Sequence, residues 1–197
     1  TGKKWPEMTN EERLASKVNS GNLVWDGPSV TDDAPFVVCP RPSVQVNNPD
    51  NLQGRYEAQA ASFGPPLREN GGTTGKMVLV DDGAGVGTDG CEPIQNNISG
   101  KIAIIDRGAC AFTQKVQAAE AEGAVAVIIV NNVAGAPPLM GGTDPGLTIP
   151  AVSITLDQGN LIKAQLGVGV TGTLVLDQNT LAGTHPVSGK LLVYTPN

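Results

Sequence analysis

The most constraining feature of this sequence is the segment Lys101–Asn132, which alternates between strand-like and helix-like patterns. Its first five residues, 101–105, are almost all aliphatic, and the seven residues 124–130 form a second aliphatic run rich in β-branched side chains. Between the two runs, apolar positions recur at helical spacing, at Phe112, Val116, Ala119 and Gly123. Strand, helix and strand over this length predict a right-handed βαβ crossover with parallel strands.

Shorter elements are predicted on both sides of this unit. Capping-box patterns predict helices over residues 10–18 and 155–166. Strands are predicted over 43–46, 55–62, 76–80, 149–154, 167–176 and 190–194. In the second of these, Tyr56, Ala58 and Ala60 alternate onto one face. Because 25 glycines and 15 prolines interrupt the 197 residues, we expect a mixed α/β fold of short strands with few helices.

Composition excludes several classes of protein. A hydrophobic fraction of 40% suffices for an aliphatic core, which rules out a wholly disordered chain. The net charge of −6 and the scattered lysines and arginines make nucleic acid and anionic membrane surfaces poor partners. The longest apolar run, Ala124–Val130, is far shorter than the roughly 20 residues of a spanning helix. No secretory signal pattern opens the sequence, so we expect a mature or excised part of a longer protein.

The three cysteines favour a disulfide. Cys91 and Cys110 lie in polar, glycine-containing segments rather than in apolar runs, and Cys39 is left over. The alternative is a zinc site of Cys39, Cys91, Cys110 and His185, which lacks the closely spaced ligand pairs typical of zinc sites. A disulfide indicates an oxidising, extracytoplasmic compartment.

Motifs for catalysis or cofactor binding are weak. Gly85–Gly90 satisfies the dinucleotide pattern, but no helical periodicity follows it, so a flexible loop is favoured. Asp81, Asp82 and Asp89 lack the spacing of a calcium loop and are expected to be solvated, although a calcium site stays open. His185 is the sole histidine and lies in a linker-like segment, and neither a nucleophile elbow nor a zinc-peptidase motif occurs. No cofactor, metal or catalytic residue is predicted. Asn97-Ile98-Ser99 is a glycosylation sequon, which matters only in a eukaryote.

The loop that follows residues 101–105 is the strongest candidate for ligand binding. It lies at the carboxyl edge of parallel strands, where α/β sheets bind ligands, and Arg107 offers a planar fork of N–H donors. The alternative, equally supported by the residues alone, is an Asp106–Arg107 pair that stiffens the turn. Asn131 and Asn132 follow the neighbouring strand and either bind an extended peptide or cap their own loop. Leu139, Met140 and Asp144 are candidates for the lip of a groove.

A series of segments resembles the protease-associated (PA) domain family over about residues 40–177. The segments are Ala61–Gly64, Asp89–Pro93, Gly100–Gly108, Cys110–Phe112, Lys115–Val116, Ala118–Ala124, Val130–Asn132 and Ile149–Val152. The resemblance implies a β-sandwich-like or barrel-like α/β fold without catalytic machinery, found as an insertion or appendage in secreted peptidases and in sorting receptors. It also implies a Cys91–Cys110 bridge. In members that recognise cargo peptides the Arg-Gly-x-Cys loop lies in the binding region, which favours binding over stiffening at Arg107.

These patterns together predict a flanking segment with a short helix (1–39), a PA domain (40–177), and a flanking strand and linker (178–197). The expected function is a non-catalytic module that binds or gates peptides for a larger secreted peptidase-like protein, expected to be bacterial. A spacer or lid without binding activity is the alternative, and a hydrolase fragment is a weaker one. The expected partners are peptide or protein segments and the catalytic domain of the host. The predicted peptide-binding residues are Arg107, Gly108, Ala109, Cys110, Asn131, Asn132 and Asp144.

Overall fold

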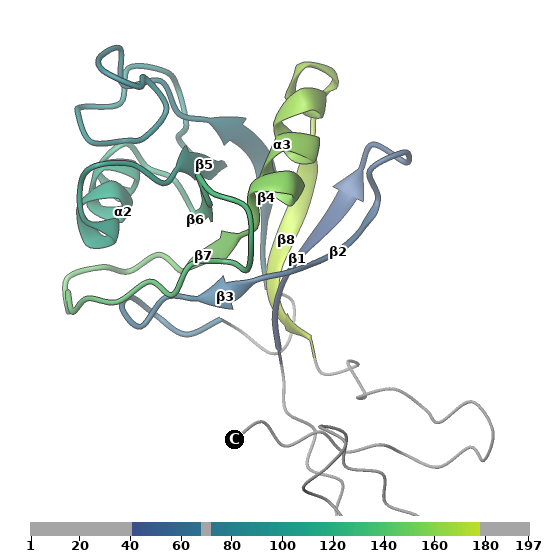
Figure 1. Ribbon diagram of the computed structural model, residues 1–197, viewed down its shortest axis with the longest axis horizontal. Helices are drawn as coiled ribbons and strands as arrows, with labels where there is room; N and C mark the ends of the chain where they lie inside the picture. The colour runs from purple at the N-terminus through teal and green to yellow at the C-terminus, as the bar shows by residue number, and fades with distance from the viewer. Residues whose placement is uncertain (1–40, 68–71, 178–197) are drawn as a thin grey trace, which may run out of the picture. The chain divides into compact units, whose positions relative to one another are not determined.

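Eight strands form one sheet in the part of the chain that this computed structural model describes, residues 41–67 and 72–177 (Figure 1). In chain order the elements are β1 Arg41–Asn48, β2 Gly54–Glu57, β3 Gln59–Ala60, β4 Thr73–Leu79, β5 Ile102–Asp106, α2 Phe112–Ala121, β6 Ala126–Val130, β7 Ala151–Ile154, α3 Leu156–Gln165, the 3-10 helix η2 Leu166–Val168, and β8 Thr171–Asp177. The helix predicted over 10–18 and the strand predicted over 190–194 lie outside the described residues. The predicted domain limits at 40 and 177 remain a prediction.

The strand order is β2-β1-β8-β4-β5-β6-β7-β3. Neighbours from β4 to β7 are parallel, and the other neighbouring pairs are antiparallel. The strands at the two ends of this order, β2 and β3, are separated in the chain by Ala58 alone, so the sheet curves back toward itself. The mixed α/β, barrel-like fold predicted from the sequence is therefore confirmed.

The single strand predicted over 55–62 is wrong. The chain forms β2 beside β1, where the Ala58 N–H donates to Pro42 O at 3.1 Å, and then leaves β1 so that Gln59 pairs with Ser153 of β7. The predicted alternation of Tyr56, Ala58 and Ala60 onto one face is nevertheless present. Tyr56, Ala58 and Ala60 all contact the same apolar cluster.

The predicted βαβ unit is present, with β5 and β6 parallel in register from Ile102↔Ala126 to Asp106↔Val130. The connecting helix α2 ends in a Schellman motif at Gly123, whose φ is 78°. The Gly123 N–H donates to Glu120 O at 2.9 Å and the Ala124 N–H to Ala119 O at 3.0 Å. Because residues 124 and 125 complete this turn, β6 begins at Ala126 rather than at the predicted 124.

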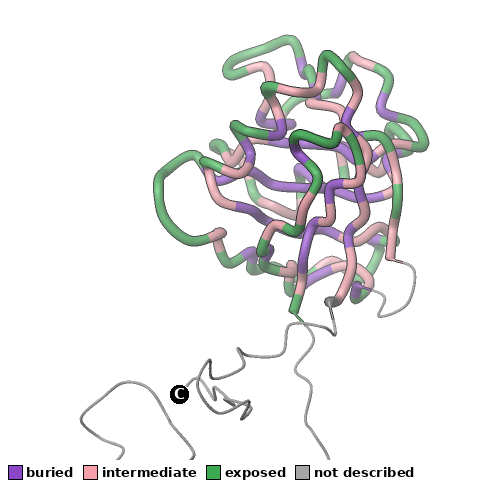
Figure 2. The backbone as a smooth tube through the Cα atoms, turned by 90° about the vertical axis from the view of Figure 1, so that its right-hand side faces the viewer, coloured by how far each residue is buried: buried purple, intermediate pink, exposed green. Residues whose placement is uncertain are grey.

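The central parallel strands are buried on both faces (Figure 2). On one face, Ile102 and Ile104 of β5 pack with Ile162 of α3. On the opposite face, Ala103 and Ile105 pack with the predicted apolar stripe of α2. The two helices therefore cover opposite faces of the parallel strands. Neither is long and apolar enough to cross a membrane, and the same holds for every other helix of the described residues.

The predicted capping box at the start of α3 is confirmed. The Gln158 N–H donates to Thr155 Oγ1 at 3.2 Å, and the Thr155 N–H donates to Gln158 Oε1 at 3.1 Å. These two bonds satisfy backbone donors that a helix start otherwise leaves free. The cap fixes where α3 begins, directly after the carboxyl end of β7.

Candidate functional site

The carboxyl ends of the parallel strands bring three loops to one edge of the sheet. They are the β4–β5 loop (residues 80–101), the β5–α2 loop (107–111) and the β6–β7 loop (131–150). Helix α2 also begins at this edge, after Ala111, which provides no side-chain cap for the helix. At such an edge, the loops that follow parallel strands and the first turn of a helix present backbone N–H groups to a ligand.

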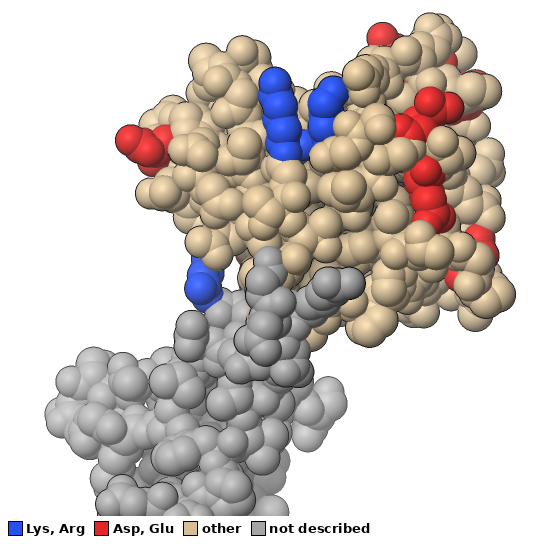
Figure 3. All heavy atoms as spheres, turned by 180° about the vertical axis from the view of Figure 1, so that it is seen from behind, with Lys and Arg blue, Asp and Glu red and all other residues tan. Residues whose placement is uncertain are grey.

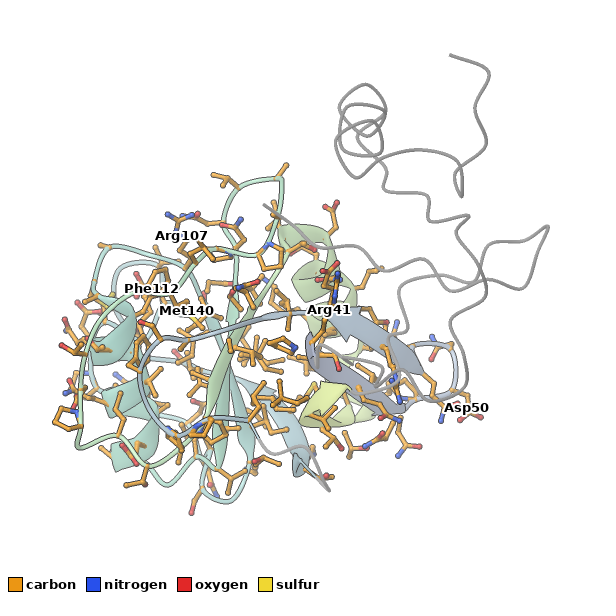
Figure 4. All side chains as sticks on the ribbon, turned by 90° about the horizontal axis from the view of Figure 1, so that it is seen from below. Arg41, Asp50, Arg107, Phe112 and Met140 are labelled. Carbon is orange, nitrogen blue, oxygen red and sulfur yellow. A yellow bond between two sulfur atoms is a disulfide. The ribbon has the colours of Figure 1, made fainter. Side chains whose placement is uncertain are left out.

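Arg107 is held in place by strand β6 and the residue that follows it. Its backbone N–H donates to Val130 O at 2.8 Å, and its guanidinium donates through Nη1 to Asn131 Oδ1 at 3.2 Å. The side chain is half-buried, and its other N–H groups have no partner among the described residues. Figure 4 shows Arg107 on the side of the molecule that carries α2.

Asp106 does not pair with Arg107. Its Oδ1 atom accepts from Lys163 Nζ of α3 at 2.8 Å, and its Oδ2 atom accepts from Thr88 Oγ1 of the β4–β5 loop at 2.8 Å. The carboxylate therefore joins three elements, and the charge of Arg107 is left without an anionic partner among the described residues. The stiffening pair that the sequence left open is not formed.

Asn131 caps its own loop. The residue is buried, its Oδ1 accepts from Arg107 and from the Asn132 N–H at 3.0 Å, and its Nδ2 donates to Ala136 O at 3.0 Å. Most of its hydrogen-bonding capacity is therefore used locally. The predicted neighbour Asn132 is exposed. Asn131 thus positions Arg107, while Asn132 is accessible to a ligand.

The other predicted residues of the β6–β7 loop have different environments. Met140 is wrong as a lip residue, because it is 2% exposed and packs in the apolar cluster with Phe63. Leu139 is 78% exposed. Asp144 accepts from Gln117 Nε2 on α2 and from the Gly146 N–H at 2.9 Å. Asp144 therefore fixes the loop to the flank of α2, and among the described residues it does not pair with Arg107.

Cys91 and Cys110 form the expected disulfide, with their Cα atoms 5.6 Å apart. The bond ties the β4–β5 loop to the β5–α2 loop. It excludes the zinc alternative, in which both sulfurs would be thiolate ligands, and its other members, Cys39 and His185, lie outside the described residues. Beside the bond, Gly108 has room for no side chain, since a Cβ there would lie 2.1 Å from Asp89 Oδ2.

The carboxylates of the β4–β5 loop are not all solvated, contrary to the prediction. Asp81 is exposed, but Asp82 and Asp89 are 1% and 5% exposed. The Cys91 N–H donates to Asp82 Oδ2 at 3.2 Å and to Asp89 Oδ1 at 3.3 Å, which compensates part of their desolvation. Oxygens of Asp82, Asp89 and Glu92 all lie within 4.8 Å of one another.

Lys115 of α2 places its amine beside this acidic group, and sequence reasoning missed it. The residue is fully buried, and its Nζ donates to Asp89 O and, at 3.3 Å, to Cys91 Sγ. Burial lowers the pKa of Lys115, and nearby carboxylates oppose that shift, namely those of Asp89, Asp82, Asp106 and Glu92. A signal was present, because position 115 falls on the buried stripe of the helix, one residue before Val116.

The remaining sequence motifs lie in loops. Gly85, Gly87 and Gly90 have positive φ and no helix follows them, so the dinucleotide pattern is a glycine-rich turn region, as predicted. Asn97 of the sequon is exposed, and its Oδ1 accepts from the Ser99 N–H at 3.1 Å. On the face shown in Figure 3, acidic side chains gather along one side and few basic ones are visible.

The comparisons with known proteins agree with this geometry. The family model of the PA domain matches residues 43–162. Signal peptide peptidase-like 4 of Oryza sativa subsp. japonica is 29% identical over 164 residues, which is 79% of this chain and 29% of the relative. The probable lipoprotein aminopeptidase LpqL of Mycobacterium tuberculosis is 38% identical over 104 residues, which is 49% of this chain and 19% of the relative.

Solved structures of peptidases contain the same fold. The aminopeptidase from Aneurinibacillus sp. strain AM-1 superposes with a TM-score of 0.53 and 29% identity, over 71% of this chain and 31% of that chain. The zinc aminopeptidase BSAP from Bacillus subtilis also gives 0.53, with 28% identity, over 72% of this chain and 32% of that chain. This chain thus spans less than a third of each of these relatives. It covers their PA region, and it belongs to the PA domain family.

Proposed function

We propose that this PA domain is a non-catalytic module that docks peptide segments for a larger, extracytoplasmic peptidase-type protein. The observation that carries the proposal is the environment of Arg107. Its guanidinium is fixed by Asn131 at the carboxyl edge of the sheet, and its other N–H donors have no partner among the described residues. An extended peptide offers carbonyl and carboxylate oxygens, and the guanidinium fork suits both. The disulfide supports an oxidising location.

Groups around Arg107 fit the same ligand. The backbone N–H groups of Gly108 and Ala109 are in an exposed segment and have no partner among the described residues. On the β6–β7 loop, Val133 and Leu139 are exposed apolar side chains available to the side chains of a peptide. Such a small set of contacts suits weak docking, in which main-chain hydrogen bonds supply affinity and neighbouring side chains supply preference.

A spacer or lid remains the second candidate function, because the two connections of the domain lie together. Arg41 at the start of β1 pairs directly with Asp177 at the end of β8. A domain whose entry and exit strands are paired can be inserted into a surface loop of another domain without separating the ends of that loop. This arrangement supports an accessory position whether or not the domain binds peptides.

Titration of the isotope-labelled protein with a mixed peptide digest, followed by NMR, separates the two functions. Docking predicts shifts clustered in residues 106–110 and 131–144, and Arg107→Ala is expected to weaken binding by roughly tenfold or more, as for other hydrogen bonds to a charged group. Arg41→Ala is the matched control, since this exposed arginine pairs only weakly with Glu57 and lies on the β1–β2 side of the molecule (Figure 4). Equal affinity of the wild type and Arg107→Ala would refute the role of Arg107, and a silent titration would favour the spacer.

A further inference from the structure

The two sulfur atoms of the disulfide have unequal surroundings. Cys91 Sγ accepts from Lys115 Nζ at 3.3 Å and from the Cys110 N–H at 3.2 Å. No hydrogen bond to Cys110 Sγ is formed by the described residues. One sulfur is therefore in contact with a buried amine and an amide donor, while the other is not.

This asymmetry decides which sulfur better carries negative charge. A lysine ammonium beside a sulfur stabilises a thiolate, and although burial lowers the pKa of Lys115, the neighbouring carboxylates oppose that shift. In thiol–disulfide exchange, one sulfur is attacked and the other leaves with the electron pair of the broken bond. A thiolate on Cys91 would be stabilised by both donors, so Cys91 is the better leaving group.

We propose that the Cys91–Cys110 disulfide is a thiol-exchange site that is attacked at Cys110 and releases Cys91 as a thiolate held by Lys115. The incoming thiolate forms a new S–S bond to Cys110 Sγ, the Cys91–Cys110 bond breaks, and its electron pair remains on Cys91 Sγ. With a monothiol, the product is a mixed disulfide at Cys110. With a dithiol, the second thiolate then displaces Cys110, so that the dithiol is oxidised by two electrons and the protein disulfide is reduced.

Access does not separate the two sulfurs, so the preference for attack at Cys110 rests on the better leaving group. Both cysteines are half-buried and each has an exposed neighbour in the chain, Glu92 beside Cys91 and Ala111 beside Cys110. Disulfides that are accessible are also the exchangeable ones. The chemistry does not depend on peptide docking, although a thiol attached to Cys110 would sit at the end of the Arg107 loop.

The β4–β5 loop has contacts that persist when the bond opens. The Asp106 N–H donates to Thr88 O at 2.8 Å, and the Gln95 N–H donates to Asp81 O at 2.7 Å. The amide of Cys91 is also held, by Asp82 Oδ2 at 3.2 Å. Because none of these bonds involves sulfur, exchange can proceed on the folded domain.

The first test uses the whole chain with Cys39→Ser, so that only the two bridged cysteines can react. The folded, oxidised protein is treated with reduced glutathione, quenched with acid, alkylated with N-ethylmaleimide and mapped by peptide mass spectrometry. We expect glutathione on Cys110 and maleimide on Cys91 in about tenfold excess over the reverse arrangement, because the better-stabilised thiolate leaves. Equal labelling, glutathione mainly on Cys91, or no adduct at either cysteine would overturn the proposal.

The second test removes the amine. Lys115→Gln is expected to slow formation of the mixed disulfide by about tenfold and to abolish the preference for Cys110. Lys115→Arg keeps the charge and is expected to retain the preference, and Lys76→Gln removes an exposed lysine of β4 as the matched control. If Lys115→Gln keeps the wild-type rate and preference, the role of Lys115 is refuted. If this variant does not fold, the labelling pattern of the Cys39→Ser protein still decides which sulfur leaves.

Discussion

Replacing Gly159 with alanine tests how closely α3 packs on the sheet beneath the site. A Cβ at this position would lie 2.1, 2.7 and 2.9 Å from Cγ1, Cγ2 and Cβ of Val130. Val130 is fully buried in β6 and β-branched, so it cannot rotate away freely. Helix propensity alone would favour alanine by about 1 kcal/mol. Overpacking typically costs about 1–3 kcal/mol, and three contacts below 3.0 Å place this case in the upper part of that range.

The clash is therefore expected to outweigh the gain in propensity, with a net loss of about 1–2 kcal/mol in the free energy of unfolding. Urea denaturation followed by circular dichroism measures this loss. Gly167→Ala is the matched control, since nothing lies within 4 Å of a Cβ at that position in η2 and its effect is expected between zero and about 1 kcal/mol of stabilisation. If Gly159→Ala were as stable as the wild type, the close approach of α3 to Val130 would be refuted.

Three further predictions concern the charges and the disulfide of the site. Burial lowers the pKa of Lys115 in the folded state, so the unfolded lysine binds a proton more strongly than the folded one. The free energy of unfolding should therefore rise with pH until the unfolded lysine deprotonates at about pH 10.4. A Lys115→Met variant should lack that rise in pH-dependent urea titrations. Lys163→Met leaves Asp106 with Thr88 as its remaining side-chain partner and should cost about 1–3 kcal/mol, measured by thermal denaturation, whereas an unchanged stability would show that the ion pair contributes nothing. Replacing Cys91 and Cys110 together by serine should cost about 3 kcal/mol on the chain-entropy relation for a sequence separation of 19, and a loss below about 1 kcal/mol in urea would contradict that relation here.

The sequence predicts the centre of this fold well because each element there is decided by neighbours in the chain. The stripe of Phe112, Val116 and Ala119 requires only helical geometry, and it packs in one cluster as expected. The glycine stop at Gly123 is equally local, because its positive φ completes a turn within the next residue. The break at Ala58 is different in kind. It arises because β2 and β3 pair with strands that are distant in the chain, and no local pattern reports that change of partner.

The buried carboxylates show why the environment of the site escaped prediction. Asp82 and Asp89 lie in a glycine-rich segment, where a charged side chain is ordinarily solvated. Their burial depends on the Cys91 N–H and on Lys115, which belongs to a helix more than twenty residues further along the chain. Lys115 itself was visible as a lysine on an apolar stripe. Such a residue predicts a buried acidic partner, but the acidic residues nearest in the sequence, Glu120 and Glu122, are not the ones buried beside it.

The contrast between Asp106 and Arg107 follows from the period of a strand. Successive side chains at the end of β5 point to opposite faces of the sheet, so Asp106 shares the face of Ile102 and Ile104, which α3 covers. On that face, the Asp106 carboxylate forms an ion pair with Lys163. Arg107 follows in the β5–α2 loop, where its guanidinium donates to Asn131. The internal Asp106–Arg107 pair is therefore not formed, because the strand ends at Asp106 and the acid is neutralised by Lys163 of α3 instead. That separation leaves the Arg107 guanidinium without an anionic partner among the described residues.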